Sequence, residues 1–246
     1  MDVTDFLNKR KFTVLLSGGK DSTATLLWIL NNINHSKWNI LYVEVTGNTS
    51  PICTQYVYDI CDKLDVSDRL VVKKRLDVDF YEYMRKYGPP IVGYYRWCLY
   101  QFKIPLMKKY SYNIVVDGLR KNENAIRKKL GSINISKLLK KVSVHPVYEW
   151  TEKHIEKYIL QNNIPINPCY YKYAHGGNCM FCPYFSRKQI ILTLNDEYWR
   201  DKILSSLKYS RGRISAEIHR KYMKYSKQKL FFNFTGVNYG TKTFIR

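Results

Sequence analysis

The sequence predicts an α/β fold, a twisted parallel sheet with helices on both faces, followed by a small helical C-terminal region. Short apolar segments rich in β-branched residues alternate with longer segments of helical pattern. This alternation is typical of parallel sheets whose strands are connected by helices. Beyond Trp150 the pattern changes to a cysteine-containing loop and then to a basic segment of helical pattern.

The individual elements follow from apolar periodicity and from turn residues. Strands are expected at residues 11–16, 40–45, 70–72 and 113–116. Helices are expected at residues 22–31, 52–64, 78–86 and 151–162, the last with Thr151 as its cap. We divide the chain into an α/β domain at residues 1–165, a cysteine-containing loop at 166–185 and a basic helical region at 186–246.

Composition favours a cytoplasmic protein with an anionic partner. Apolar residues make up 45% of the chain, and no run approaches the roughly 18 apolar residues that a membrane-spanning helix needs. The start of the chain lacks the pattern of a signal peptide. A formal charge of +21 favours contact with nucleic acid, although many basic proteins are merely soluble. Six cysteines in a cytosolic chain indicate metal or redox chemistry rather than disulfides.

A glycine-containing loop between the first expected strand and helix predicts a phosphate site. Gly18 and Gly19 let the backbone approach phosphate, and the helix start near Ser22 adds free N–H groups and a positive dipole end. Ser17 and Ser22 offer hydroxyls, Lys20 offers charge, and Asp21 offers a carboxylate for Mg²⁺. The loop lacks the Walker A pattern. The simpler interpretation is an ordinary glycine turn.

Five further segments, in order along residues 11–185, match the pattern of a known family. They are Thr46-Gly47; Arg96-Trp97-Cys98 with Lys103 and Pro105; Gly118-Leu119-Arg120 with Glu123 and Arg127; Pro146, Trp150-Thr151, Asn167-Pro168 and Tyr170; and Cys179-Met180-Phe181-Cys182-Pro183. With the loop, they resemble the PP-loop ATP-pyrophosphatase (adenine nucleotide α-hydrolase) superfamily, and within it the phosphoadenosine-phosphosulfate reductase family. The resemblance implies a HUP/Rossmann-like fold with a nucleotide at the carboxyl ends of its strands.

The resemblance also implies which residues serve an ATP and Mg²⁺ site. Nucleotide-binding candidates are Ser17, Gly18, Gly19, Lys20, Asp21, Ser22, Thr46, Gly47 and Gly118. Catalytic candidates are Lys20, Asp21, Lys103, Arg120 and Arg127. Arginine forks suit phosphate or sulfate oxygens. The alternative for Lys103, Arg120 and Arg127 is that they are solvated surface cations.

The intact loop favours ATP cleavage between the α- and β-phosphates over reduction of a sulfonucleotide. By resemblance, reductases usually carry a degenerate loop and a nucleophilic cysteine in a C-terminal tail, whereas no cysteine follows Cys182 here. We therefore expect a sulfurtransferase that adenylates and thiolates nucleic acid, either DNA or tRNA, with a donor such as a cysteine desulfurase. A reductase of adenylyl sulfate or its 3′-phosphorylated form, and a non-catalytic nucleotide sensor that binds nucleic acid, are the alternatives.

The cysteines predict a metal centre. Cys179 and Cys182 form a C-x-x-C pair, and Cys98 and Cys169 are the further candidate ligands. A [4Fe-4S] cluster suits sulfur transfer, while zinc or a metal-free dithiol remains open because ligand identity does not decide among them. His175 lies close to this pair in sequence. Cys53 and Cys61 are expected to be buried small hydrophobes in the second helix.

The C-terminal region combines cations with aromatic residues. The cations are Arg220, Lys221, Lys224, Lys227 and Lys229, and the aromatic residues are Tyr222, Tyr225, Phe231 and Phe232. Such a segment can bind phosphates and stack on bases. Equally, it can be a helix whose aromatic side chains face the core while its lysines face water.

Overall fold

The computed structural model describes residues 2–93, 95–123 and 125–228. Its centre is a six-stranded sheet with the order β3-β2-β1-β4-β6-β5. The strands are β1 (Phe12–Leu16), β2 (Trp38–Glu44), β3 (Leu70–Lys74), β4 (Ile114–Val116), β5 (Ile133–Ser136) and β6 (Lys141–Val144). Neighbouring strands are parallel except at one edge, where β5 is antiparallel to β6. The order reverses beside β1, which places a crevice at the carboxyl end of this strand.

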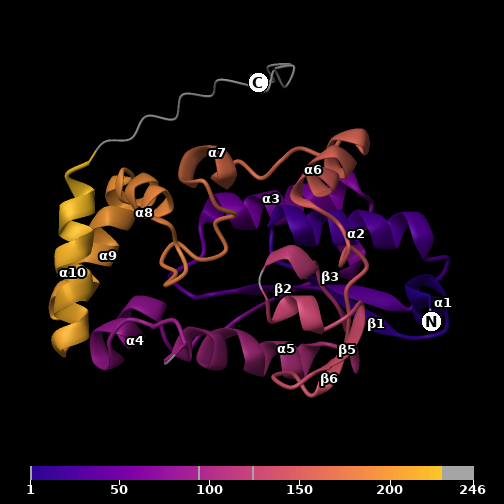
Figure 1. Cartoon of the computed structure of the whole chain (residues 1–246), viewed down its shortest axis with the longest axis horizontal. Helices are drawn as coiled ribbons and strands as arrows, with labels where there is room; N and C mark the ends of the chain where they lie inside the picture. Colours follow the sequence, from indigo (N-terminus) through magenta and orange to yellow (C-terminus); the bar gives the residue numbers. More distant parts are fainter. Residues whose placement is uncertain (1, 94, 124, 229–246) are drawn as a thin grey trace.

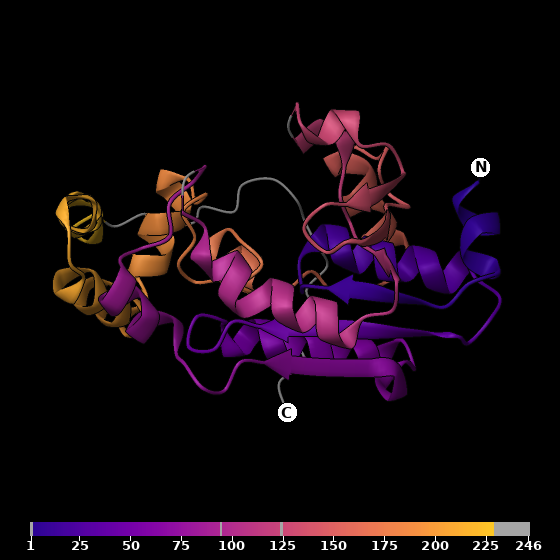
Figure 2. The same ribbon diagram turned by 90° about the horizontal axis from the view of Figure 1, so that it is seen from below.

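Helices cover both faces of the sheet, as the sequence predicts. The helices are α1 (Val3–Asn8), α2 (Lys20–Asn32), α3 (Pro51–Lys63), α4 (Phe80–Tyr87), α5 (Ile104–Tyr110), α6 (Glu152–Gln161), α7 (Cys169–Tyr173), α8 (Arg187–Leu194), α9 (Glu197–Tyr209) and α10 (Arg213–Ser226). In Figure 1, α2 and α3 lie on one face and α5 on the opposite face, and Figure 2 shows α5 from the second direction. None of the described helices has the length and apolar character needed to cross a membrane.

The C-terminal helices α8, α9 and α10 pack together at one end of the molecule, where α9 lies against α4 (Figure 1). The Ser210 hydroxyl at the end of α9 donates to the Met84 carbonyl in α4. One continuous hydrophobic core includes both Leu7 near the N-terminus and Tyr222 in α10. The helical region therefore shares the core of the sheet region, and the division at residues 165 and 185 stays a prediction.

The predicted strands and helices are confirmed to within two residues at either end. Thr151 caps α6, as predicted: its hydroxyl accepts from the His154 N–H at 3.3 Å, and the His154 ring accepts from the Thr151 N–H at 3.5 Å. The hairpin of β5 and β6 was not predicted. Its strands are only four residues long and half polar, so their stability comes from pairing β6 with β4 rather than from local propensity.

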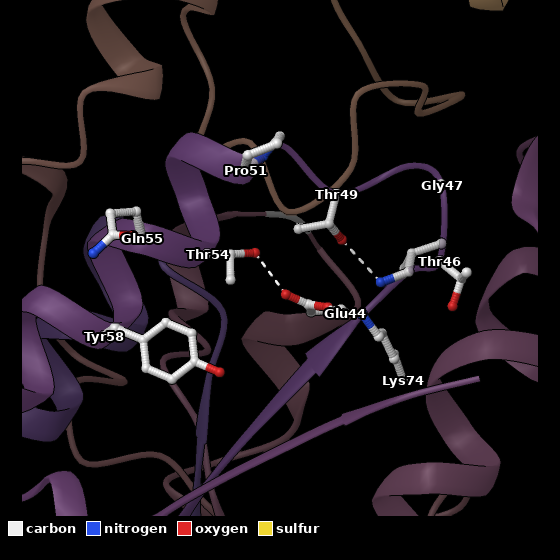
Figure 3. A pocket seen from close by; sticks show the side chains of 10 residues that line it. Glu44, Thr46, Gly47, Thr49, Pro51, Thr54, Gln55, Tyr58 and Lys74 are labelled. Atoms are coloured by element: carbon white, nitrogen blue, oxygen red, sulfur yellow. Dashed lines mark hydrogen bonds and ion pairs between the residues drawn. The ribbon is translucent and has the colours of Figure 1, made fainter. Parts of the chain in front are cut away.

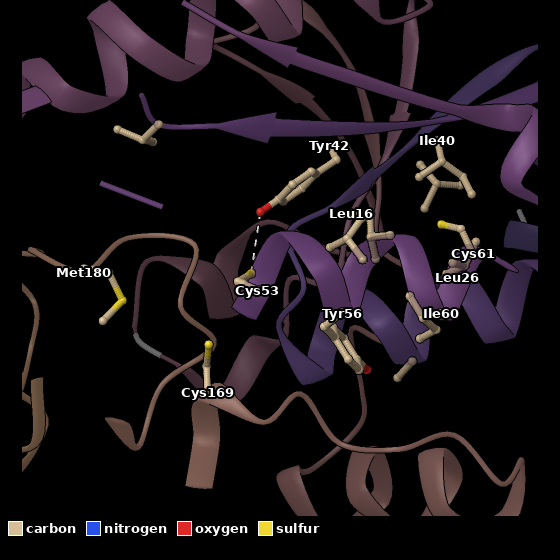
Figure 4. Packing of buried hydrophobic residues seen from close by; sticks show 14 of the residues in the cluster. Leu16, Leu26, Ile40, Tyr42, Cys53, Tyr56, Ile60, Cys61, Cys169 and Met180 are labelled. Atoms are coloured by element: carbon tan, nitrogen blue, oxygen red, sulfur yellow. Dashed lines mark hydrogen bonds between the residues drawn. The ribbon is translucent and has the colours of Figure 1, made fainter. Parts of the chain in front are cut away.

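The two cysteines of α3 are core residues, which confirms the prediction for Cys53 and Cys61. Both side chains are fully buried and pack with Leu16, Ile40 and Ile60 (Figure 4). Burial raises the pKa of Cys53 to about 12 and that of Cys61 to about 11, because a thiolate is poorly solvated in an apolar core. Both thiols are therefore protonated and unreactive at neutral pH.

Candidate nucleotide site and cysteine loop

The backbone between β1 and α2 is held in a tight turn by serine hydroxyls. The Ser22 hydroxyl donates to the Gly19 carbonyl at 2.8 Å and accepts from the Ser17 N–H at 3.1 Å. Gly18 has a φ of +72°, which favours glycine, and a β-carbon there would lie 2.7 Å from the Cys53 sulfur. Because of this turn, α2 begins at the carboxyl end of β1. A helix N-terminus in this position is suited to bind anions.

Gly118 is placed against this turn by the strand pairing of β1 with β4. A β-carbon at Gly118 would lie 2.6 Å from the carbonyl carbon and oxygen of Asp21, and 2.9 Å from the Ser22 nitrogen. These are backbone atoms of the first turn of α2, so they have little freedom to move aside. Glycine at position 118 is therefore required by packing against the phosphate loop, and its role in nucleotide binding stays a prediction.

We expect Gly118→Ala to weaken ATP binding by at least ~10-fold and to lower stability by roughly 1–3 kcal/mol, because the first turn of α2 must shift. ATP binding by calorimetry and unfolding by urea measure the two effects. Gly212→Ala is the matched control, since a β-carbon at Gly212 meets no atom within 4 Å although its φ of +100° is strained. Equal ATP affinity in the Gly118→Ala variant and the wild type would contradict the steric argument.

Charged side chains from three distant segments meet at the start of α2. The Arg120 Nε lies 2.5 Å from the Asp21 Oδ1, and the Lys20 Nζ lies 3.6 Å from the Asp21 Oδ2. Lys20 also pairs with Glu152 at 2.9 Å, and this pairing lowers the pKa of Glu152. Sequence reasoning did not assign Glu152 to this group of charges. Lys20 and Arg120, the cations predicted to bind phosphate at this turn, are thus paired with carboxylates.

Arg127 belongs to the same charged group. It forms an ion pair with Glu123, and it interacts electrostatically with Asp117, Asp21 and Arg120. Burial lowers the pKa of Arg127, which nevertheless stays protonated as arginine does in proteins. The side chain of Arg120 is only 10% exposed. Arg120 is therefore enclosed beside Asp21 of the phosphate loop, whereas the side chain of Arg127 is 39% exposed, and the catalytic role of both arginines stays a prediction.

A buried histidine orients Asp117, another residue that sequence reasoning missed. The His145 Nδ1 lies 2.7 Å from the Asp117 Oδ1, and the His145 Nε2 lies 2.7 Å from the Asn134 Nδ2. Because the amide nitrogen of Asn134 donates, the ring accepts at Nε2 and donates from Nδ1 to the carboxylate. Asp117 directly follows β4, so a polar residue after a buried strand was the available signal.

The cysteine loop lies over the phosphate loop and shares one pocket with it. The pocket has a volume of about 310 Å³. It is lined by Ser17, Gly19 and Asp21, by Lys103, and by Tyr170, His175, Gly176, Gly177, Asn178, Cys179, Cys182 and Phe185. The Lys103 Nζ donates to the Asn178 Oδ1 at 2.5 Å, which holds this cation against the cysteine loop. Phosphate-binding groups and two thiols therefore face the same space.

Cys98, Cys179 and Cys182 are neighbours. Burial, with a smaller contribution from the nearby Cys179, raises the pKa of both Cys98 and Cys182 to about 11. Cys169 lies elsewhere: it is fully buried, packs beside Gly177, and interacts with Cys53 (Figure 4). Of the four candidate metal ligands, the structure thus brings three together and separates the fourth.

No three His, Cys, Asp or Glu side chains of the described residues form a ready metal-binding group. The donor chemistry of these cysteines fits a thiophilic metal, since Cys179 and Cys182 line the pocket and Cys98 lies near both of them. Cys169 does not fit this group, because the core encloses it beside Cys53. The metal ligation itself stays a prediction.

His175 is a buried structural residue in the wall of the pocket. Its Nδ1 accepts from the Gly177 N–H at 3.1 Å, so its Nε2 donates to the Thr193 hydroxyl, also at 3.1 Å. The ring stacks on Phe185 with centroids 4.2 Å apart. Burial lowers the pKa of His175 from 6.5 to about 4, so the ring is neutral at physiological pH.

We expect His175 to destabilise the protein in acid. In the unfolded chain the ring binds a proton below about pH 6.5, whereas the folded ring does so only below about pH 4. The free energy of unfolding should therefore decrease as the pH is lowered from about 6.5 to about 4. This group contributes at most about 1.4 kcal/mol of that decrease per pH unit. Urea unfolding across this range, compared with His175→Gln, measures the contribution. An unchanged slope in the variant would contradict it.

Thr46 and Gly47 lie outside this pocket. They line a second cavity of about 400 Å³ with Glu44, Thr54 and Lys74 (Figure 3). The Thr46 hydroxyl donates to the Arg75 carbonyl. A β-carbon at Gly47 would overlap the carboxylate of Asp79, so this glycine is required by packing. Their nucleotide-binding role stays a prediction.

Helix α10 has one buried aromatic side and one exposed basic side, as the second interpretation of the basic region predicts. Tyr222 is buried and stacks on Phe181 of the cysteine loop, with centroids 5.4 Å apart. Arg220, Lys221 and Lys224 are exposed on the same helix. The predicted contributions of Lys229, Phe231 and Phe232 lie outside the described residues.

Comparison with known proteins identifies relatives over most of the sheet region. The family model described as phosphoadenosine phosphosulfate reductase domain matches residues 11–187. An uncharacterized protein of Methanocaldococcus jannaschii is 27% identical over 182 residues, which cover 71% of this chain and 36% of that protein. An adenosine 5′-phosphosulfate reductase of Shouchella clausii is 31% identical over 71 residues, which cover 29% of this chain and 30% of the reductase. The chain thus spans about a third of the length of these relatives.

Solved structures with a related fold include two sulfur enzymes. The phosphoadenylyl-sulfate reductase of Candida auris, in a phosphate complex, has a TM-score of 0.48 and 18% identity, with 67% of this chain and 88% of that chain covered. The U34-tRNA thiolase NcsA of Methanococcus maripaludis, with its [4Fe-4S] cluster, has a TM-score of 0.44 and 13% identity, with 90% and 74% covered. Both scores are below 0.5, so no activity is inferred from either.

The strand, glycine turn and helix at the carboxyl edge of a parallel sheet place the protein in the PP-loop class of α/β proteins. Within this class, the chain belongs to the phosphoadenosine phosphosulfate reductase domain family, whose model matches more than half of its length.

Proposed function

We propose that the protein cleaves ATP between the α- and β-phosphates, transfers AMP to an oxygen of a nucleic acid, and replaces that oxygen with sulfur. The observation that supports this most directly is the shared pocket, in which Ser17, Gly19 and Asp21 face Cys179 and Cys182. A phosphate bound at the loop and a sulfur carried by the cysteines would be within one cavity. Adenylation and sulfur delivery can then act on the same group of the acceptor without its release.

Positive side chains would stabilise the negative charge that grows on the α-phosphate and on the leaving pyrophosphate. Lys103 lines the pocket, and Arg120 and Lys20 sit at the start of α2. Their carboxylate partners compete with phosphate, so nucleotide binding should exchange these ion pairs for contacts with phosphate oxygens. Asp21 would supply a carboxylate for Mg²⁺, which neutralises phosphate charge when bound.

The three neighbouring thiols suit the sulfur-transfer half of the reaction. We propose that Cys98, Cys179 and Cys182 together hold a [4Fe-4S] cluster, with zinc as the alternative. Held by these three cysteines, such a cluster would supply sulfide for transfer. The sulfur nucleophile attacks the carbon or phosphorus atom bonded to the adenylated oxygen. A bond from this atom to sulfur forms, and its bond to oxygen breaks as AMP leaves with the original oxygen. A donor such as a cysteine desulfurase would supply the sulfur.

The charge of the protein supports a polyanionic acceptor, either DNA or tRNA. The chain carries 41 Lys and Arg against 20 Asp and Glu. Arg96, close in sequence to Cys98, lies over the exposed ring of Tyr184, with its guanidinium carbon 4.9 Å from the ring centroid. Cations and exposed aromatic rings near the cysteines are suited to phosphates and unpaired bases.

Turnover with α-labelled ATP tests the proposal. Protein purified without oxygen should release AMP and pyrophosphate when a suitable DNA or tRNA is present, and the acceptor should gain sulfur when a donor is added. Metal and sulfide analysis of the same protein separates an iron–sulfur cluster from zinc. The absence of AMP and pyrophosphate with every acceptor would count against the proposal, and tight ATP binding without turnover would indicate a nucleotide sensor instead.

Sulfonucleotide reduction is the second candidate. The similarity to adenosine 5′-phosphosulfate reductases favours it, including a match to that of Staphylococcus haemolyticus at 27% identity over 138 residues. The reductase hypothesis predicts thioredoxin-dependent release of sulfite from adenylyl sulfate or its 3′-phosphorylated form. Sulfite release without any cleavage of ATP would select this function over nucleic-acid thiolation.

A further inference from the structure

The Tyr170 hydroxyl accepts a hydrogen bond from a backbone amide that is suited to bind phosphate. Tyr170 lies on α7, and its oxygen accepts from the Lys20 N–H at 3.2 Å. Lys20 is the first residue of α2, and the first amides of a helix have no partner within the helix. A phosphate at the loop and the Tyr170 oxygen therefore compete for the same N–H group.

The same hydroxyl has a proton to donate. In the described part of the chain, its hydrogen bond to Lys20 uses the oxygen as acceptor, and no described acceptor takes the hydroxyl proton. Tyr170 lines the pocket together with Ser17, Gly19 and Asp21. Burial raises the pKa of Tyr170 to about 12, so the hydroxyl stays protonated at neutral pH. A neutral donor of this kind is complementary to an anionic phosphate oxygen.

The segment that carries Tyr170 also ties the phosphate loop to the cysteine loop. The Asn167 amide donates to the Gly18 carbonyl at 2.7 Å and to the Gly176 carbonyl at 2.9 Å. β-Carbons at Gly19 and Gly176 would each lie 3.4 Å from the Tyr170 oxygen. The hydroxyl thus lies between the two loops. If it moves, the packing of residues 174–182 against it must change.

We propose that Tyr170 is an additional phosphate ligand, whose hydroxyl exchanges the Lys20 N–H for a bound phosphate oxygen and thereby changes the packing of residues 174–182. This inference rests on the proposed function only in placing a nucleotide phosphate at the loop. Tyr170 thus has two linked roles. It binds phosphate, and the binding of phosphate changes the packing of the segment that carries Cys179 and Cys182.

Pyrophosphate is the probe, and Tyr170→Phe is the variant, because phenylalanine keeps the ring and removes only the hydroxyl. Calorimetric titration should show pyrophosphate binding weakened by about fivefold or more, because the hydrogen bond lost to a charged group is stronger than the neutral bond to the Lys20 N–H that the variant frees. Tyr171→Phe is the matched control, since Tyr171 is a neighbour on α7 that does not line the pocket. Affinity within twofold of the wild type in Tyr170→Phe would overturn the proposal.

Hydrogen exchange tests whether phosphate binding changes the packing of residues 174–182. Pyrophosphate should change the exchange of amides at residues 174–182 in the wild type and in Tyr171→Phe, but not in Tyr170→Phe at a saturating concentration. An equal change in Tyr170→Phe would overturn the coupling. Neither measurement needs turnover, so a protein that binds pyrophosphate as described yet never forms AMP would refute the proposed reaction and leave this inference intact. Lack of pyrophosphate binding by the wild type would refute the inference itself.

Discussion

Replacing Asp21 by asparagine is expected to reduce AMP formation by about 10²–10³-fold. The Asp21 carboxylate lies 2.5 Å from Arg120 and 3.6 Å from Lys20, at the first turn of α2. Asparagine has nearly the same shape but no charge. The substitution therefore removes the proposed Mg²⁺ ligand and weakens the orientation of Arg120, while the turn itself remains. Release of labelled AMP from α-labelled ATP under single-turnover conditions measures the effect.

The control is Asp77→Asn, which makes the same chemical change in an exposed ion pair. Asp77 pairs with Arg75 at 2.7 Å, and its side chain is 66% exposed. Exposed ion pairs contribute little, so this variant should fold and turn over like the wild type. Thermal unfolding shows whether Asp21→Asn remains folded. A folded Asp21→Asn protein that forms AMP within a few-fold of the wild-type rate would contradict the proposed role of Asp21.

Replacing Cys179 or Cys182 by alanine is expected to abolish sulfur incorporation, by about a hundredfold or more, while pyrophosphate release persists. Both cysteines line the pocket opposite the phosphate loop, but neither is hydrogen-bonded to the loop in the described structure. Loss of a thiol should therefore remove the sulfur-carrying group without disturbing Ser17 or Gly19. Parallel assays of sulfur in the acceptor and of pyrophosphate in solution separate the two half-reactions.

Cys61→Ala provides the comparison, because Cys61 is a buried cysteine of α3 outside the pocket. It should cost some stability through lost packing and leave both half-reactions in place. Sulfur incorporation that survives in both Cys179→Ala and Cys182→Ala would exclude these thiols as carriers or ligands. Loss of pyrophosphate release together with sulfur incorporation would show instead that the cysteine loop is needed to form the nucleotide site.

The proximity of two loops that are far apart in sequence is the central feature of the site. Asn167 and Tyr170 contact Gly18 and Lys20 across about 150 positions of the chain. Lys103 contacts Asn178 in the same region. These contacts make the pocket a joint product of the first βα unit and the cysteine loop. Substitution of a residue that joins the two loops, such as Asn167, should therefore affect both phosphate binding and the placement of the cysteines.

The sequence by itself determined the alternation of strands and helices, the phosphate turn and the cap of α6. Each of these features depends on residues that are neighbours in the chain: an apolar run followed by Ser17-Gly18-Gly19, or Thr151 placed before a helical segment. Local backbone preference and periodicity suffice for such features. The burial of Cys53 and Cys61 was also predictable from the sequence, because an apolar helix that covers a sheet must bury one side.

Only the tertiary structure decided how distant charges and thiols pair. The pairing of Lys20 with Glu152 and the orientation of Asp117 by His145 join segments that no local pattern connects. The same holds for Cys169, which has the chemistry of a metal ligand but packs beside Cys53 because α7 carries it into the core. Side-chain type shows what a residue can bind, whereas the packing of the sheet and helices determines which partner it meets.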